Sequence, residues 1–367
     1  AHTWLDRITD STCAGYKSIA PAGGLSPFST TSLTWERKWP VKPDLVMEGG
    51  NAARDADSFC TELDDLSLIS TSYRPERRLF APFNMTSAAA AQAAWMATQI
   101  QIAYPQAWPE TLRALMVHSA EWTDAMEEAF LDGDSKKGYE RLLQICGYGV
   151  PDLGKALRCA TSRLTLIAQQ ELQPYEQKSG GGYGTHDMHL FELPWPKEVL
   201  ADLGEQPVTM RVTLSYFVEP GPGRIGWRDR YRYASHALRF DVNAPEESPL
   251  DFMKRINHAV QDEEEEDGRV GANSGSSHWL LGKRARDRGA IHSDIWKGNG
   301  AELAACNHIG VYPVIGWWRE RAHLGRWNRK ARYALVVSIH TPEQTVDIYT
   351  PVVAQIGVSH PILTEAG

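Results

Sequence analysis

The chain has 367 residues, of which 42% are hydrophobic and 23% are charged, and its formal net charge is −8 at pH 7. This length can hold two domains with sizeable cores, and the mix of residues is that of a globular protein. The negative charge offers no electrostatic basis for binding nucleic acid, and no apolar run approaches the length of a membrane span.

Residues 1–160 show an α/β pattern. Residues 45–47 and 66–70 are predicted to be short strands, whereas residues 87–104, 109–119 and 151–160 carry helical patterns. A turn-rich surface loop is predicted over residues 132–138, which include two glycines and two aspartates. The α/β half of the chain is therefore expected to end near residue 160.

The pattern changes after residue 160, where strand follows strand. The predicted strands share β-branched or alternating apolar residues, and they cover residues 164–172, 188–193, 208–218, 237–242, 331–340 and 345–354. Strands without intervening helices indicate an antiparallel β-sandwich. We therefore predict a β-sandwich domain over residues 161–367, with a helical and acidic insertion around residues 249–300.

Three stretches of this second half leave two interpretations open. The six carboxylates at 262–267, after a predicted helix at 250–260, suggest calcium, but a solvated mobile loop fits better because oxygen cages need alternating ligands and turn glycines. His186 and His189 could form half of a metal site, although a solvated loop leading into a strand is favoured. The tryptophans and arginines of residues 316–332 fit either a binding hot spot or sandwich packing with solvated arginines.

The five cysteines are scattered and form no Cys-x-x-Cys pair. Their spacing argues against a disulfide framework or a zinc site, so no metal and no cofactor are predicted. This usage of cysteine favours a reducing cytoplasm.

The segment Phe83-Asn84-Met85-Thr86-Ser87 opens a long alanine-rich helix. A serine at a helix N-terminus lies near free backbone N–H groups and the positive end of the helix dipole, which favour developing negative charge. An ordinary N-cap in front of a core helix is the alternative. On the first interpretation, a buried helix presents the Ser87 hydroxyl in an open cleft.

Five blocks of the first half resemble, in order, motifs of the subtilisin-like serine proteases. Residues 85–91 resemble the nucleophile motif Gly-Thr-Ser-x-Ala-x-Pro, and residues 41–50 resemble the Lys-Pro-Asp strand and turn that precede it. Residues 25–29, 104–120 and 147–157 resemble the flanking strand end, the next helix and the closing turn. The resemblance implies a partial parallel-sheet domain of the subtilase type over residues 1–160. Residues 208–216 resemble a strand of the jelly-roll domains appended to many subtilases.

The resemblance further implies a serine endopeptidase in which Ser87 attacks the scissile carbonyl, with Asn84, Met85 and Thr86 lining the cleft. The family's Asp-Thr/Ser-Gly and His-Gly-Thr motifs do not occur in this chain, and Asn51 does not match the oxyanion asparagine. We expect the triad Asp and His and the oxyanion Asn to lie outside a truncated chain. The fragment alone is then expected to be inactive, with His2 and His118 as surface or satisfied core residues.

Two positions depart from the nucleophile motif. Ala91 replaces the usual proline, which is favoured but not required in a first turn. Met85 replaces glycine, and we expect it to have a negative φ and to tune substrate preference through its flexible side chain.

A pseudoprotease that acts through its sandwich is the first rival, and another hydrolase such as an esterase is the second. The chain lacks a Gly-x-Ser-x-Gly elbow around Ser87, which argues against an α/β-hydrolase. The absence of disulfides and the Met-Thr-Ser-Ala-Ala motif resemble intracellular bacterial subtilases, and this implies an AAA ATPase partner beside the protein substrate.

Overall fold

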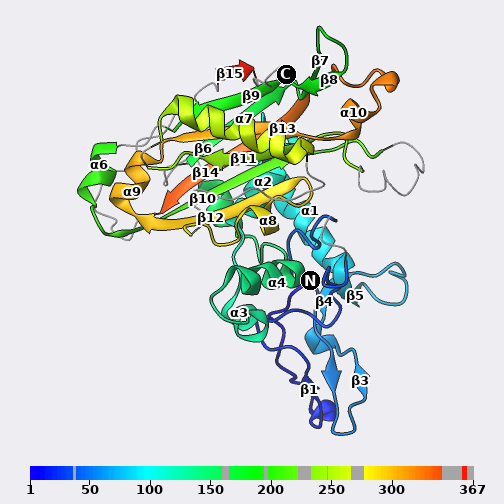
Figure 1. Ribbon diagram of the computed structural model, residues 1–367. Helices are drawn as coiled ribbons and strands as arrows, with labels where there is room; N and C mark the ends of the chain where they lie inside the picture. The colour runs from blue at the N-terminus through cyan, green and yellow to red at the C-terminus, as the bar shows by residue number, and fades with distance from the viewer. Residues whose placement is uncertain are drawn as a thin grey trace. The chain divides into compact units, whose positions relative to one another are not determined.

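The computed structural model describes residues 1–35, 39–158, 165–193, 197–221, 233–245, 247–265, 277–340 and 358–361. Contacts divide the chain into two compact units (Figure 1). The first comprises Ala1–Gln106 and Ser119–Leu157, and the second comprises Ala107–His118 and Arg158–Gly367. The second unit thus takes in a helix from inside the predicted first domain.

Unit 1 contains short strands and several helices. Its strands are β1 (Lys17–Ser18), β2 (Ala53–Arg54), β3 (Cys60–Thr61), β4 (Leu68–Thr71) and β5 (Phe80–Phe83). Its helices are α1 (Met85–Ala103), α3 (Asp124–Phe130), α4 (Lys136–Cys146) and α5 (Leu153–Arg158), the last ending at the unit boundary. A small core of Val46, Met126, Leu142, Ile145 and Cys146 packs α3 and α4 together.

The parallel sheet expected for the first half is wrong for the described residues. Strands β1, β2 and β3 pair antiparallel, as do β4 and β5. One isolated parallel bridge joins His2 to Glu48. The predicted strand at 45–47 is extended chain that lacks a ladder, with Val46 N–H donating to Gly149 O at 3.0 Å. A strand pattern in the sequence becomes a sheet only when a neighbouring strand supplies the hydrogen bonds.

Helix α4 occupies the second half of the predicted loop at 132–138. The Ser135 hydroxyl accepts a hydrogen bond from Gly138 N at 3.1 Å and caps the helix. A Cβ on Gly138 would lie 2.6 Å from Gly133 O, so the glycine read as a turn signal is needed for close packing of the helix start.

Unit 2 contains two four-stranded antiparallel sheets, which confirms antiparallel sheets after residue 160. The first sheet has the order β12-β10-β14-β6 and the second has the order β11-β13-β9-β15. Their strands are β6 (Thr165–Leu172), β9 (Asp187–Glu192), β10 (Pro207–Tyr216), β11 (Ala237–Val242), β12 (Ile291–Asn299), β13 (His308–Val314), β14 (Ala331–His340) and β15 (Val358–Pro361). A small hairpin of β7 (Tyr175–Gln177) and β8 (Tyr183–Thr185) completes the strands.

The main core lies between these two sheets. Val212 and Leu214 of β10 and Leu335 and Val337 of β14 are fully buried in it, together with Phe240 of β11. Alternate residues of β10 point the other way, because successive side chains of a strand face opposite sides. The alternation therefore builds a two-sheet sandwich with a continuous apolar centre.

Each sheet also carries a helix on its outer face (Figure 1). Helix α7 (Pro249–Glu265) places Phe252, Ile256 and Val260 against Tyr312 and Val314 of β13. Helix α2 (Pro109–Ser119) lies on the first sheet, where His118 forms hydrogen bonds with Thr213 of β10 and Ser338 of β14. The remaining helices are α6 (Lys197–Asp202), α8 (Lys283–Arg286), α9 (Gly300–Ala305) and α10 (Trp317–Glu320). No helix in the described ranges is long and apolar enough to cross a bilayer.

The structure describes only part of the acidic run and none of the last predicted strand. The carboxylates at 262–265 continue α7 as a helix, whereas residues 266–276 and the strand predicted at 345–354 lie outside the described residues. Strand β12 falls within the predicted insertion at 249–300, which is therefore not wholly helical and acidic.

Candidate active site around Ser87

Ser87 lies in the first turn of helix α1 and is exposed. The helix starts at Met85, two residues before the predicted start. Asn84 is the N-cap residue, yet its side chain makes no capping hydrogen bond; it donates instead to Ser67 Oγ at 2.9 Å and to Glu62 Oε2 at 3.3 Å. The first-turn N–H groups beside Ser87 thus receive no side-chain cap, and the positive end of a 19-residue helix lies there.

The turn at Glu48-Gly49-Gly50 supports this helix start. Met85 N–H donates to Gly49 O at 2.7 Å, and Gln92 Nε2 of α1 donates to Glu48 O at 2.6 Å. The Glu48 carboxylate in turn accepts Gly50 N–H at 2.8 Å. The block that precedes the nucleophile motif by more than thirty positions in sequence therefore holds both the loop and the first turns of α1.

The two glycines of this turn permit the close approach. A Cβ on Gly49 would lie 3.0 Å from Met85 O, and a Cβ on Gly50, whose φ is +78°, would collide with Asn84 Oδ1. Neither position can hold a larger residue without displacing the loop that carries Ser87.

Met85 has a φ of +71°, so the expected negative φ is wrong. A left-handed backbone strains a residue with a long side chain, and glycine avoids that strain. The side chain is 46% exposed beside Ser87. The chain therefore keeps the backbone geometry that suits glycine while placing methionine there, and strain of this kind gathers at functional sites.

The described residues place no imidazole in hydrogen-bond contact with the Ser87 hydroxyl. His118 bonds instead to Thr213 Oγ1 at 2.9 Å and Ser338 Oγ at 2.7 Å, as a satisfied core residue. His2 is buried in unit 1, where burial lowers its pKa to about 4 and favours the neutral ring. The base that a serine nucleophile needs is thus absent from the described chain around Ser87.

The side-chain amide of Asn51 forms hydrogen bonds within unit 1 through both its nitrogen and its oxygen. Its amide donates to Leu5 O at 2.9 Å and Ala20 O at 2.8 Å, and its oxygen accepts from Ala52 N at 2.9 Å. The side chain is completely buried and ties two loops of unit 1 together. It has no spare donor for an oxyanion.

Glu48, Ser67 and Gln92 are supporting residues that the sequence analysis missed. They hold the Ser87 loop through hydrogen bonds that join segments 17 to 44 residues apart. The sequence signal for them is indirect: the Glu-Gly-Gly turn belongs to one of the blocks that resemble the family, and Ser87 belongs to another.

Tryptophans and histidines singled out in the second half make contacts within unit 2. Trp317 and Trp318 are buried and donate their indole N–H groups to the backbone oxygen and the carboxylate of Glu219, respectively. His189 bonds to the Tyr333 hydroxyl at 2.6 Å, whereas His186 Nδ1 lies 2.9 Å from Asp187 Oδ1. The described part of the chain has no group of three or more metal-ligating side chains.

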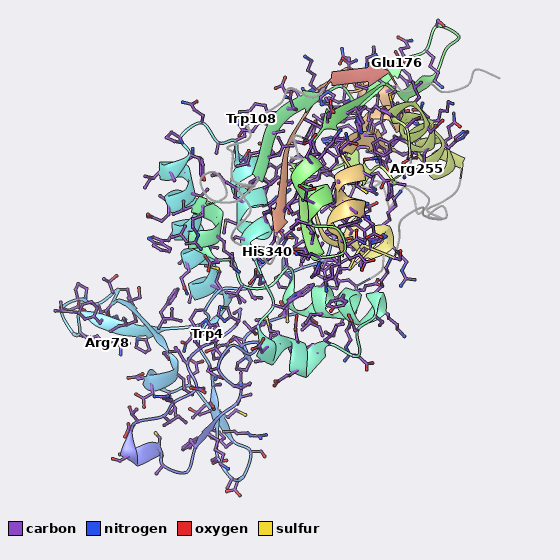
Figure 2. All side chains as sticks on the ribbon, turned by 90° about the vertical axis from the view of Figure 1, so that its left-hand side faces the viewer. Trp4, Arg78, Trp108, Glu176, Arg255 and His340 are labelled. Atoms are coloured by element: carbon purple, nitrogen blue, oxygen red, sulfur yellow. The ribbon has the colours of Figure 1, made fainter. Side chains whose placement is uncertain are left out.

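A buried ionic cluster in unit 2 is also satisfied internally. Arg255, labelled in Figure 2, donates two hydrogen bonds to the Glu247 carboxylate. It also bonds to Asp241 Oδ2 at 2.6 Å, and Lys283 Nζ lies 2.7 Å from the same oxygen. Burial alone would raise the pKa of Asp241, but the two cations outweigh it and hold the pKa below its usual value. These charges join α7 and α8 to β11.

Sequence comparison with known proteins points to one family for most of the first half of the chain. Residues 8–149 match the sequence profile described as the Subtilase family. An uncharacterized protein of Sinorhizobium fredii, y4bN, is 28% identical over 180 residues. The match spans 48% of this chain and 38% of that relative, so the chain covers well under half of its length. Residues 8–149 are therefore a subtilase family segment, and the Ser87 helix lies within it.

Proposed function

We propose that this protein is part of a subtilisin-like serine endopeptidase in which Ser87 is the nucleophile. The carrying observation is the position of Ser87: an exposed hydroxyl in the first turn of α1, within the subtilase segment, beside N–H groups that lack a side-chain cap. A helix N-terminus of this kind favours the negative charge that develops when a hydroxyl attacks a carbonyl.

The mechanism assigns one task to each residue near Ser87. The Ser87 hydroxyl attacks the scissile carbonyl and forms an acyl-enzyme, and its backbone N–H holds the oxyanion. Asn84, Met85 and Thr86 line the cleft near the scissile bond, with Asn84 fixed through Ser67. We place the base, its carboxylate partner and the oxyanion amide in polypeptide outside residues 1–367, because the family's Asp and His motifs do not occur in this sequence.

The partners follow from this assignment. Protein or peptide is the substrate of the subtilase family, and an AAA ATPase that delivers unfolded chains is proposed from the resemblance alone. Among the described residues, Cys13, Cys60, Cys146 and Cys306 form no disulfide, which supports a reducing cytoplasm as the location.

A fluorophosphonate probe tests the assignment because it reacts only with an activated serine. We expect the intact protein to be labelled at Ser87, as located by peptide mapping, and residues 1–367 alone to remain unlabelled. Loss of one triad member lowers such reactivity by about 10⁴–10⁶. Ser87→Ala in the intact protein is the control and should abolish labelling.

Two results would contradict the proposal. Labelling of residues 1–367 alone at the rate of the intact protein would mean that a base is present in this chain. An intact protein that is unlabelled, while Met85→Gly restores labelling, would indicate a pseudoprotease blocked by its strained methionine.

A further inference from the structure

The hairpin of β4 and β5 carries an ordered, exposed tip. Leu68 pairs with Phe83 and Thr71 pairs with Phe80 in its ladder. The turn is closed by Ser72 N–H to Leu79 O at 2.9 Å and by Arg77 N–H to Arg74 O at 3.0 Å. Figure 2 shows the hairpin projecting with Arg78 on it. These hydrogen bonds hold the backbone of the tip in one conformation, so its side chains project from fixed positions.

The tip is basic in an acidic chain. Arg74, Arg77 and Arg78 are all exposed and form no ion pair with the described residues, and Glu76 is the only carboxylate between Thr71 and Phe80. Three positive and one negative side chain give this turn a charge of +2, against −8 for the whole protein. Arg74 lies over the ring of Tyr73 at 5.1 Å, and Tyr73 is 83% exposed.

The hairpin is connected directly to the candidate nucleophile. Strand β5 ends at Phe83, and Ser87 follows four residues later in the first turn of α1. At about 3.3 Å per residue of strand, the five steps from Arg78 to Phe83 span roughly 17 Å, and Ser87 lies in the helical turn that follows. An extended peptide covers that distance with about five or six residues.

We propose that this arginine hairpin binds acidic side chains of the polypeptide substrate, about five or six residues from the bond that Ser87 attacks. The inference rests on the proposed function and adds a substrate preference to it. Guanidinium groups form forked hydrogen bonds with carboxylates, and exposed charges of one sign steer an oppositely charged partner. The exposed Tyr73 and Leu79 provide apolar contact beside the charges.

A peptide library digested by the intact protein tests this preference. We expect enrichment of Asp and Glu at positions about five or six residues from the cleavage site on one side. Arg77→Glu/Arg78→Glu should lower kcat/KM for an acidic peptide about 10-fold and leave a neutral peptide unchanged. The charge reversal should also raise cleavage of a lysine-rich peptide, and added salt should reduce both effects.

The control is Arg54→Glu, which reverses one charge at an exposed position of β2 in the same unit and is compared with Arg78→Glu alone. It should leave the preference intact. An unbiased library, or an equal loss with Arg54→Glu, would overturn the proposal.

A binding measurement separates this inference from the proposed function. Anisotropy of a fluorescein-labelled acidic peptide is measured with the intact Ser87→Ala protein, which needs no catalysis. Weaker binding by the added Arg77→Glu/Arg78→Glu change supports the hairpin even if Ser87 proves unreactive. Equal binding by both proteins, or tighter binding of a single-stranded thymidine oligonucleotide than of the acidic peptide, rejects it.

Discussion

Helices α1 and α2 follow one another in the chain, yet their surroundings differ. In unit 1, α1 buries Ala88, Met96 and Ile100, while Trp95 and Ile102 remain 57% and 67% exposed. In unit 2, α2 buries Ala114, Leu115 and Val117 completely, and its polar side chains also form hydrogen bonds with the outer face of a sheet. The more apolar helix, α1, is therefore not the more buried one, so apolar content alone did not decide burial.

Arg113 shows how α2 is held. Its guanidinium donates to Ser215 Oγ at 3.0 Å and to the backbone oxygens of Tyr216 and Ala290, and it stacks on Phe217 at 4.3 Å. Two positions further along the same face of β10, Arg211 donates to Val117 O of α2 at 3.0 Å. Each polar group at this contact is fixed by a partner, which makes the contact specific.

The largest expected effect comes from a matched pair of substitutions on the two helices. Arg113→Ala should lower the free energy of unfolding by about 2–4 kcal/mol, because it leaves several acceptors without their donor. Trp95→Ala on α1 should change it by less than about 1 kcal/mol, because that side chain is largely exposed. Guanidinium denaturation measures both. Similar losses for the two variants would show that α1 is packed as fully as α2.

Acid should destabilise unit 2 through its buried histidines. His236 and His292 have pKa values lowered to about 3, by burial in both cases. In the unfolded chain these histidines have a pKa near 6.5, so between pH 6.5 and 3 the unfolded chain binds protons that the folded chain does not bind. The free energy of unfolding is therefore highest above pH 6.5 and falls as the pH drops towards 3. The slope reaches about 1.4 kcal/mol per pH unit for each histidine.

Hydrogen exchange between pH 6.5 and 4.5 checks this prediction, with intrinsic rates corrected. Protection of the amides in the β10–β14 ladder should fall faster with acid than the average protection of the protein. His236→Phe should reduce the pH dependence of the free energy of unfolding by about 1 kcal/mol per pH unit. His323→Gln, at an exposed position, is the control. A slope that is unchanged in His236→Phe would contradict a buried neutral imidazole at this position.

The smallest expected effect lies at Met85. Met85→Gly should raise the stability of unit 1 by about 0.5–1 kcal/mol, since the left-handed backbone strain removed exceeds the entropy that glycine adds to the unfolded chain. In the active protein it should alter KM or substrate preference more than kcat. Local stability is read from exchange of the first turns of α1, with Met96→Leu as a helix control. A loss of protection would mean that the methionine packs and is not strained.

The sandwich strands were predictable where one face is apolar. The alternation in β10, β11 and β14 gave their positions, and the bounds of β11 and β14 agree with the prediction. Strand β12 was missed because His292 and Asp294 occupy its core-facing positions. Asp294 is accommodated there by the backbone N–H groups of Leu281 and Gly282, which no local pattern reveals.

The candidate site also has features that the sequence predicted and features that only the tertiary structure decided. The order of short motifs in the sequence determined the family segment and the position of Ser87 at the start of a helix, because capping and helix-forming residues act locally. Tertiary structure alone decided the left-handed φ of Met85, the support from Glu48, and the sheet on which α2 lies. Those features depend on hydrogen bonds between residues far apart in the chain, which form only when the fold brings them together.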